Sequence, residues 1–190
     1  MNTAFFRPFA LAAVLSLGMP AVAGAVEYTT LDAQASHAAF AYSQMNVKMD
    51  GRFGALAAPV LSFDPARPEA AKVVIEVALA GVDAGYDEAN AELSKDEWLA
   101  TAAHPLAVFT SDQVDALGDG RYQATGRLTI KGVTKTVAAP FTFKEDGQTG
   151  VFEGGFTFQR ADFGVGEGPW KDFSIVANDI GITFRVVAKP

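Results

Sequence analysis

The stretch from Gly120 to Phe143 reads GRYQATGRLTIKGVTKTVAAPFTF. Its first half alternates between apolar or small residues and polar ones with a period of two, which is typical of a half-buried β-strand and not of a helix. The alternation resumes after Lys131-Gly132-Val133-Thr134, and two such runs joined by a short turn with glycine predict an antiparallel hairpin. The apolar face of this hairpin consists of Tyr122, Ala124, Gly126, Leu128, Ile130, Val137, Ala139, Phe141 and Phe143.

A sheet built around this hairpin has one oily face, which a single flat sheet cannot hide from water. Other segments alternate in the same way, notably those at 38–42, 45–53, 72–80, 106–114, 152–160 and 180–186. Counting them gives roughly eight to ten strands, which predicts an all-β domain closed into a barrel or packed as a sandwich.

One short helix is expected between the strands. The run Ser94-Lys95-Asp96-Glu97 has the S-x-x-E form of a capping box and stands directly before Trp98. His104-Pro105 should end this helix, because proline disfavours a helical conformation in the residue before it.

The N-terminal segment has the pattern of a secretory signal. Arg7 is its single charge, an apolar run follows, and small residues precede two alternative cleavage sites, after Ala23 or after Ala25. The apolar run is shorter than the roughly 20 residues that span a bilayer. We therefore expect a signal peptide at 1–23 and an exported protein.

Removing residues 1–23 from the 190 leaves 167, which fits one domain at 24–190. It also removes Arg7, so that 14 basic residues face 22 acidic ones and the formal charge changes from −7 to −8. This acidic balance argues against nucleic acid or anionic lipid headgroups as partners. The sequence has no cysteine, which excludes disulfides, Fe–S clusters and cysteine-based zinc sites.

The sequence contains no convincing catalytic or metal-binding arrangement. His37 and His104 are far apart and have no metal-ligand spacing, and no G-x-S-x-G elbow occurs. The glycine-rich run at 164–168 leads into Pro169 rather than into a helix, so it is expected to be a loop at the barrel rim and not a phosphate cradle. We expect no metal, no cofactor and no enzymatic activity.

Arg160 shares a predicted face with Phe156 and Phe158, so its guanidinium points into the barrel. Two roles are open for it. It either pairs structurally with Asp162 or with a loop carbonyl, or it contacts the polar head of an oily ligand; the structural role is favoured, since buried charges are usually paired.

Large apolar side chains would point inward from nearly every strand, with small residues such as Ala38, Gly51 and Gly154 between them. An eight-stranded barrel is just wide enough to be filled by side chains or to hold one small ligand. The alternation does not distinguish a dry, interdigitated core from a channel.

Several motifs follow one another as they do in the YceI-like family, which this sequence resembles over nearly all of the mature chain. They are Ser36-His37-Ala38-Ala39-Phe40, Gly51-Arg52-Phe53-Gly54, His104-Pro105 with Phe109-Thr110-Ser111, the run from Gly126 to Lys135, and the run from Arg160 to Gly166. The resemblance implies an extended antiparallel, lipocalin-like β-barrel of about eight strands. It also implies an apolar tunnel that holds a long isoprenoid chain in the bacterial periplasm.

The candidate ligand-binding residues are those expected to line this tunnel. They are Phe40, Tyr42, Phe53, Ile75, Leu79, Trp98, Phe109, Leu128, Ile130, Phe141, Phe156, Phe158, Arg160, Ile182 and Phe184. The family has no agreed catalytic residues to carry over.

The sequence departs from the usual family pattern at Asp87-Glu88-Ala89-Asn90, where many members have an Arg-Asp pair. Trp98 in the expected helix, together with Gly168-Pro169-Trp170, resembles the branch found beside or fused to b-type membrane cytochromes. The implied function is a non-catalytic carrier of a polyprenol derivative or quinone. The alternatives are an accessory to a membrane cytochrome, with a homodimer as a further expectation, and an enzyme in which Arg160, Asp162 or His104 polarises a lipid head group.

Overall fold

The computed structural model of this chain describes residues 26–190, which form ten strands and one α-helix. The strands are β1 Thr30–Leu31, β2 His37–Gln44, β3 Val47–Arg52, β4 Leu56–Ser62, β5 Lys72–Ala78, β6 Leu106–Gly118, β7 Arg121–Ile130, β8 Val133–Asp146, β9 Thr149–Gln159 and β10 Asp179–Lys189. The helix is α1 Asp87–Leu93, and the short 3-10 turns are η1 Pro68–Ala70, η2 Leu79–Gly81, η3 Arg160–Phe163 and η4 Gly168–Lys171.

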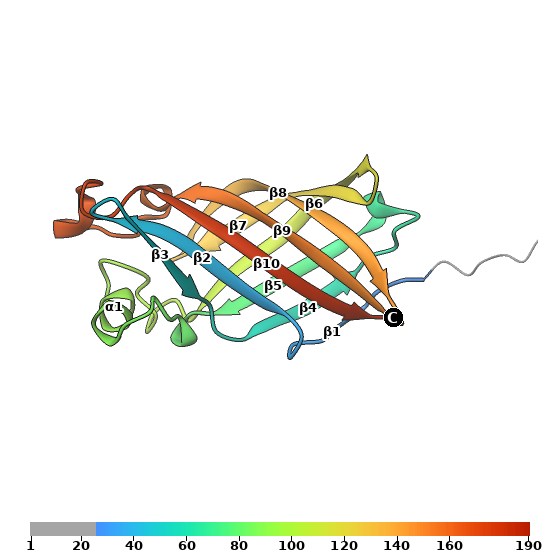
Figure 1. Cartoon of the computed structure of the whole chain (residues 1–190), viewed down its shortest axis with the longest axis horizontal. Helices are drawn as coiled ribbons and strands as arrows, with labels where there is room; N and C mark the ends of the chain where they lie inside the picture. Colours follow the sequence, from blue (N-terminus) through green and yellow to red (C-terminus); the bar gives the residue numbers. More distant parts are fainter. Residues whose placement is uncertain (1–25) are drawn as a thin grey trace, which may run out of the picture.

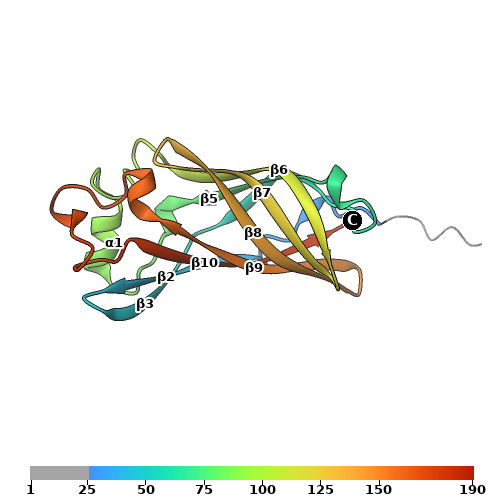
Figure 2. The same ribbon diagram turned by 90° about the horizontal axis from the view of Figure 1, so that it is seen from above.

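All strands belong to one antiparallel sheet that curls into an elongated barrel (Figure 1). Its order is β3-β2-β10-β9-β8-β7-β6-β5-β4, with β1 paired to β10. From β4 to β10 each strand therefore pairs with the next in the chain, in line with the tendency of consecutive strands to be neighbours. Two of these connections are long: η2 and α1 lie between β5 and β6, and η3 and η4 lie between β9 and β10. The strands cross the long axis obliquely, and α1, η3 and η4 gather at one end, opposite the C-terminus (Figure 2). The all-β, lipocalin-like prediction is confirmed, with ten strands where about eight were expected.

The barrel closes where β3 passes into β4, since these consecutive strands are the two edges of the sheet. Phe53 N donates to Ala38 O of β2 (3.1 Å), and Ala55 O accepts from Ala78 N of β5 (3.0 Å). The segment 53–55 thus bridges the edges at the middle of the barrel. At the C-terminal end a bridge between Tyr28 and Phe63 closes the remaining gap.

The central hairpin forms as predicted, with β7 and β8 paired from Arg121 opposite Thr142 to Ile130 opposite Val133. Lys131 and Gly132 make the turn with φ values of 50° and 74°, the conformation that a tight two-residue hairpin needs. The predicted inward face is buried at the following positions of β7: Tyr122, Ala124, Gly126, Leu128 and Ile130.

The helix lies elsewhere than predicted. It occupies Asp87–Leu93, while the capping-box segment and the residues up to 103 form a series of turns. In a helix the carbonyl of Glu97 would accept from the residue four positions later, but here it accepts from the backbone N–H groups of Gly166 (2.7 Å) and Glu167 (2.8 Å). Contacts with this distant loop override the local helix pattern.

Two strand predictions also need correction. Met45, expected within a strand, lies in the β2–β3 turn with φ 48° and is 65% exposed. In β6 the expected alternation is interrupted, because the pairing with β7 shifts between Ser111 and Gln113. This bulge places Val114 on the same inner face as Phe109, although an unbroken period of two would put them on opposite faces.

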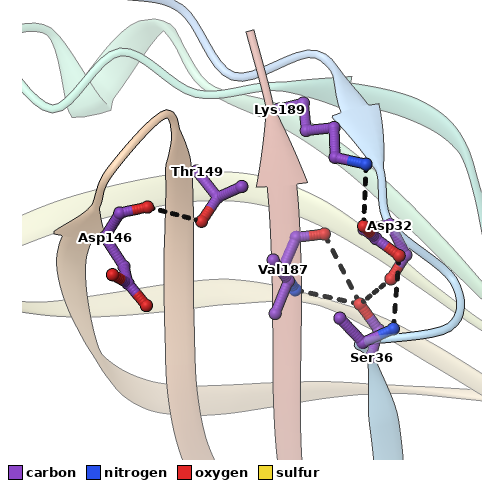
Figure 3. A network of polar contacts seen from close by, with 7 residues as sticks. Asp32, Ser36, Asp146, Thr149, Val187 and Lys189 are labelled. Carbon is purple, nitrogen blue, oxygen red and sulfur yellow. Dashed lines mark hydrogen bonds and ion pairs between the residues drawn. The ribbon is translucent and has the colours of Figure 1, made fainter.

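A polar network holds the C-terminal end of the barrel together (Figure 3). The buried Ser36 hydroxyl donates to Asp32 O (2.7 Å) and accepts from Val187 N of β10 (2.9 Å). The Asp32 carboxylate pairs with Lys189 (2.8 Å), and this hydrogen-bonded partner is the main cause that lowers the pKa of Asp32. In the β8–β9 turn, Thr149 donates to Asp146 O (2.8 Å). The Ser36 hydroxyl is thus the acceptor for the backbone N–H group of Val187 in β10.

We expect Ser36→Ala to lower the free energy of unfolding by about 1–3 kcal/mol, because it leaves the N–H of Val187 buried without an acceptor. Urea denaturation measures this change. Thr134→Ala is the matched control, since it removes a hydroxyl that is bonded to Thr129 on the exposed face of the central hairpin. Equal losses in the two variants would contradict the role given to Ser36.

Within residues 26–190, no helix has the length and hydropathy needed to cross a membrane. The predicted signal peptide at 1–23 and both cleavage sites lie outside the described residues, so the boundary at residue 24 stays a prediction.

Candidate functional site

The barrel encloses a cavity of about 410 Å³ that follows its long axis. Every residue predicted to line a tunnel does line it: Phe40, Tyr42, Phe53, Ile75, Leu79, Trp98, Phe109, Leu128, Ile130, Phe141, Phe156, Phe158, Arg160, Ile182 and Phe184. Among the described residues around it, the charged or amide side chains are Gln44, Glu88, Glu92 and Arg160. The remainder of the lining is almost wholly apolar. That these residues contact a ligand stays a prediction.

The cavity is blind at the C-terminal end, where aromatic rings fill the barrel. Phe63, 1% exposed, sits at their centre, with its ring centroid 5.0 Å from that of Phe152 and 5.1 Å from that of Phe143. Tyr122 and Tyr28 complete this aromatic plug. Such edge-on and tilted ring contacts are the packing that aromatic residues favour. Among the described residues, these rings block the C-terminal end, which leaves the end that carries α1 as the open one.

The rest of the cavity stays open because several rings lie flat against the wall of the barrel, over glycines of the neighbouring strand. A Cβ atom on Gly51 would lie 2.1 Å from Cζ of Phe40, and one on Gly126 would lie 2.8 Å from Cζ of Phe109. Phe184 covers Gly154 in the same way. The missing side chains leave room for the rings at the wall, so the alternation of large and small residues produces a channel rather than a filled core.

We expect Gly51→Ala to narrow the cavity, because the new methyl group displaces the Phe40 ring from the wall. The clash involves the end of a movable side chain, so the cost in stability should be about 1–3 kcal/mol. Uptake of the neutral apolar dye Nile red, followed by fluorescence, should weaken severalfold. Gly181→Ala is the control, since its Cβ would meet nothing nearer than 3.9 Å, and an equal effect there would contradict this account.

The open end, which we call the mouth, is formed by α1 and by the loops that carry η3 and η4 (Figure 1). Glu88, Ala89, Glu92 and Leu93 of α1, with Tyr86 before it, line the cavity. None of these residues is among the candidates predicted from the sequence, because the helix was expected at 94–97 and beyond rather than here. Tyr86, Ala89 and Leu93 are spaced by three and four residues, and this helical period is the signal that would have revealed both the helix and its inner face.

Arg160 organises the loop that follows β9, and it is 1% exposed. Nε donates to Ala177 O (3.1 Å), Nη1 to Val165 O (2.9 Å) and Gly166 O (3.0 Å), and Nη2 to Trp170 O (2.7 Å) and Val176 O (2.8 Å). These five carbonyls match the five N–H donors of a guanidinium. Of the two roles predicted for Arg160, the structure shows the structural one, with loop carbonyls as partners.

Asp162 does not pair with Arg160, so that form of the prediction is wrong; within the described residues, no carboxylate lies within ion-pair distance of the guanidinium. The rings of Trp98 and Phe173 lie 5.5 Å and 5.2 Å from its Cζ atom. Burial lowers the pKa of Arg160, and carbonyl dipoles and aromatic faces offset part of this desolvation. The loop closes tightly on it, since a Cβ on Gly166 would lie 2.0 Å from Nη1.

Aromatic side chains with polar tips complete the mouth. Trp98 is 7% exposed and packs on Trp170 with ring centroids 5.4 Å apart, and its Nε1 has no hydrogen-bond acceptor among the described residues. Burial raises the pKa of Tyr42, with Tyr86 beside it as a further cause. The Tyr86 hydroxyl donates to the Gln44 side chain (3.0 Å), which ties the segment before α1 to β2.

The remaining candidates for chemistry are not gathered into a site. His37 and His104 do not line the cavity, and neither does Asp162. Within residues 26–190, no group of three or more metal-ligating side chains is placed to hold an ion.

Comparison with known proteins finds sequence relatives over most of the chain. Residues 29–188 match the model of the YceI-like domain family. A UPF0312 protein of Pseudomonas syringae pv. tomato is 32% identical over 190 residues, which cover 93% of each chain.

Solved structures share the fold. BcnA from Burkholderia cenocepacia is 34% identical, with a TM-score of 0.80 over 84% of this chain and 99% of the other. A polyisoprenoid binding domain from Saccharophagus degradans, 18% identical, reaches a TM-score of 0.67 over 85% of this chain and 98% of the other. With the family model matched over nearly the whole barrel, this chain belongs to the YceI-like domain family.

Proposed function

We propose that this protein is a periplasmic carrier that holds a long-chain isoprenoid lipid, a polyprenol derivative or a quinone, inside its barrel. The observation that carries the proposal is the blind, apolar cavity of about 410 Å³. The name of the structural relative from Saccharophagus degradans, a polyisoprenoid binding domain, supports this ligand class.

Binding in such a tunnel rests on desolvation and shape. Burial of apolar groups favours binding by about 0.8 kcal/mol per CH₂, so a five-carbon isoprene unit contributes about 4 kcal/mol before the costs of ordering. Because the aromatic plug around Phe63 blocks one end, the hydrocarbon tail enters first and the polar head stays at the mouth. A thin, flexible, branched chain suits a narrow lumen lined by rings and branched aliphatic side chains.

The polar groups in and around the cavity favour a carrier over an enzyme. All five N–H groups of Arg160 are engaged by loop carbonyls, and His104 and Asp162 lie away from the lumen. These are the residues that would have to polarise a lipid head in an enzyme. Export to the periplasm rests on the predicted signal at 1–23, while the membrane cytochrome partner and the homodimer stay predictions from the resemblance.

Mass spectrometry of an organic extract of the purified protein tests the proposal. We expect a long-chain isoprenoid in a fixed molar ratio to the protein, enriched over its share of the host's lipids. An extract that contains only the host's phospholipids in their membrane proportions would reject the carrier. If a membrane pull-down recovers a cytochrome and no isoprenoid co-purifies, the accessory role replaces it.

A further inference from the structure

Exposed apolar side chains gather on one side of the mouth. Met45 in the β2–β3 turn and Val47 at the start of β3 are 65% and 59% exposed, and Phe173, shortly after η4, is 49% exposed. The turn and the loop with η4 project at this end of the barrel (Figures 1 and 2). They lie side by side, since Met45 N donates to Ile175 O (2.8 Å). We call Met45, Val47 and Phe173 the rim patch.

The rim patch is continuous with the lining of the cavity. Gln44 at the end of β2 lines the lumen, and so do Trp170 and Val176, which flank Phe173 in the chain. Tyr86, which is 38% exposed, also lines the lumen, and its hydroxyl donates to the Gln44 side chain (3.0 Å). An apolar chain that leaves the lumen on this side therefore passes from the lining onto the rim patch.

Two lysines flank the rim patch. Lys48 follows Val47 directly, and Lys171 stands two residues before Phe173. Both are exposed, and neither forms an ion pair with another residue of the described chain. Apolar and aromatic side chains beside lysines suit the boundary between the acyl chains and the phosphates of a bilayer. There the apolar groups enter the acyl layer and the ammonium groups meet the phosphates.

The bilayer that fits this surface is a zwitterionic one. The helix α1 carries Asp87, Glu88 and Glu92 at the same end of the barrel, and the formal charge of the chain is −7. These charges oppose a long-range attraction to an anionic surface. The lysines can still meet lipid phosphates locally, so the apolar side chains supply most of the affinity.

We propose that the rim patch docks the open end of the barrel on a zwitterionic phospholipid bilayer, so that an isoprenoid passes between membrane and tunnel without crossing water. This inference rests on the proposed function and names the surface at which the carrier exchanges its lipid. A bilayer fits better than a protein partner, because the patch adjoins the opening through which a membrane lipid must pass. Moving a long apolar chain through water is unfavourable in proportion to the area exposed, and docking avoids this cost.

Co-sedimentation with phosphatidylcholine vesicles measures docking without any isoprenoid present, and it uses delipidated protein purified after export. We expect Met45→Asp to weaken vesicle binding at least about tenfold, because a carboxylate is costly to bury in the apolar layer. The variant should fold, since residue 45 has φ 48°, a conformation in which Asp is enriched. Phe173→Ser tests the other segment of the rim patch and should weaken vesicle binding severalfold, because it removes an apolar ring.

Leu117→Asp is the matched control, because Leu117 is 50% exposed and the variant adds the same charge. Leu117 lies beside the β6–β7 turn at the plugged end, where Phe143 N donates to Gly120 O (2.8 Å). Vesicle binding should stay within about twofold there.

A second measurement separates docking from the cavity itself. Transfer of geranylgeraniol from the vesicles to the protein should slow at least about tenfold in Met45→Asp, in step with the loss of docking. Uptake of dissolved Nile red should not change in this variant, because Met45 does not line the cavity.

The outcomes separate the two proposals. If Met45→Asp and Leu117→Asp bind vesicles equally well, the docking inference is overturned and the carrier proposal stands. The inference is also overturned if Met45→Asp dissociates a dimer in analytical ultracentrifugation while neither form binds vesicles, since the rim patch then covers a second copy. If the protein docks on vesicles but takes up no isoprenoid from them or from solution, the carrier proposal fails, and the exchange role of the rim patch fails with it.

Discussion

The variant Leu128→Arg should abolish lipid retention, with at least a hundredfold loss of affinity for an isoprenoid. Leu128 is 8% exposed, points into the lumen from β7 and lies two residues before the end of that strand. An arginine here places a guanidinium among the apolar side chains of the lumen, and burying an uncompensated charge costs several kcal/mol. Since 1.4 kcal/mol is a factor of ten, about 3 kcal/mol suffices for the expected loss.

Mass spectrometry measures the lipid that co-purifies with each variant, and titration with an isoprenoid measures its affinity. Thr129→Arg is the matched control, because it adds the same charge one residue further along β7, on the face where Thr129 bonds to the exposed Thr134. Phe156→Asp tests the same lumen from β9, in case Leu128→Arg does not fold. A folded Leu128→Arg or Phe156→Asp protein that retains its lipid would show that the ligand does not occupy the tunnel.

The variant Arg160→Met should lower the free energy of unfolding by about 3–5 kcal/mol, because it deprives five loop carbonyls of their donors at once. A typical domain has only about 5–15 kcal/mol in total, so the loss is large. Arg160→Lys should give an intermediate loss, since an ammonium has three donors in place of five.

Urea denaturation measures these changes, and hydrogen exchange should show protection lost first in residues 161–178, the loop that Arg160 holds. Arg185→Met is the matched control. Arg185 pairs with Glu153 on the exposed face of the barrel, where an ion pair contributes about 0–1 kcal/mol. If Arg160→Met is no more destabilising than Arg185→Met, the carbonyl contacts of Arg160 contribute little to stability.

The strands and their inner faces were predictable because a period of two is a local property of an extended chain. Each inward residue of β7 and β10 follows from the alternation alone, and so do tunnel-lining residues of other strands, such as Phe40 and Phe156, once the sheet closes. The prediction failed for β6 beyond Ser111, because a single extra residue reverses the faces and leaves no mark in the composition.

The mouth was the least predictable part. The capping box at 94–97 favours a helix locally, but the carbonyl of Glu97 bonds to the loop at Gly166, about seventy residues later in the chain. The true helix, α1, has no fully buried residue, so its apolar stripe is weak, and the sequence did not predict it. Glu88 and Glu92 were therefore not predicted to line the tunnel.

The sequence by itself determined an all-β domain, a barrel or a sandwich, with an apolar interior, because alternation along a strand assigns each side chain to a face without reference to any other part of the chain. Only the tertiary structure decided that this interior is an open, blind tunnel. That outcome depends on which ring lies over which glycine of a neighbouring strand, as Phe40 does over Gly51, and on how the loop after β9 folds back so that its carbonyls converge on Arg160. Such contacts join residues whose proximity is set by strand register and loop path, and these arise only when the whole chain has folded.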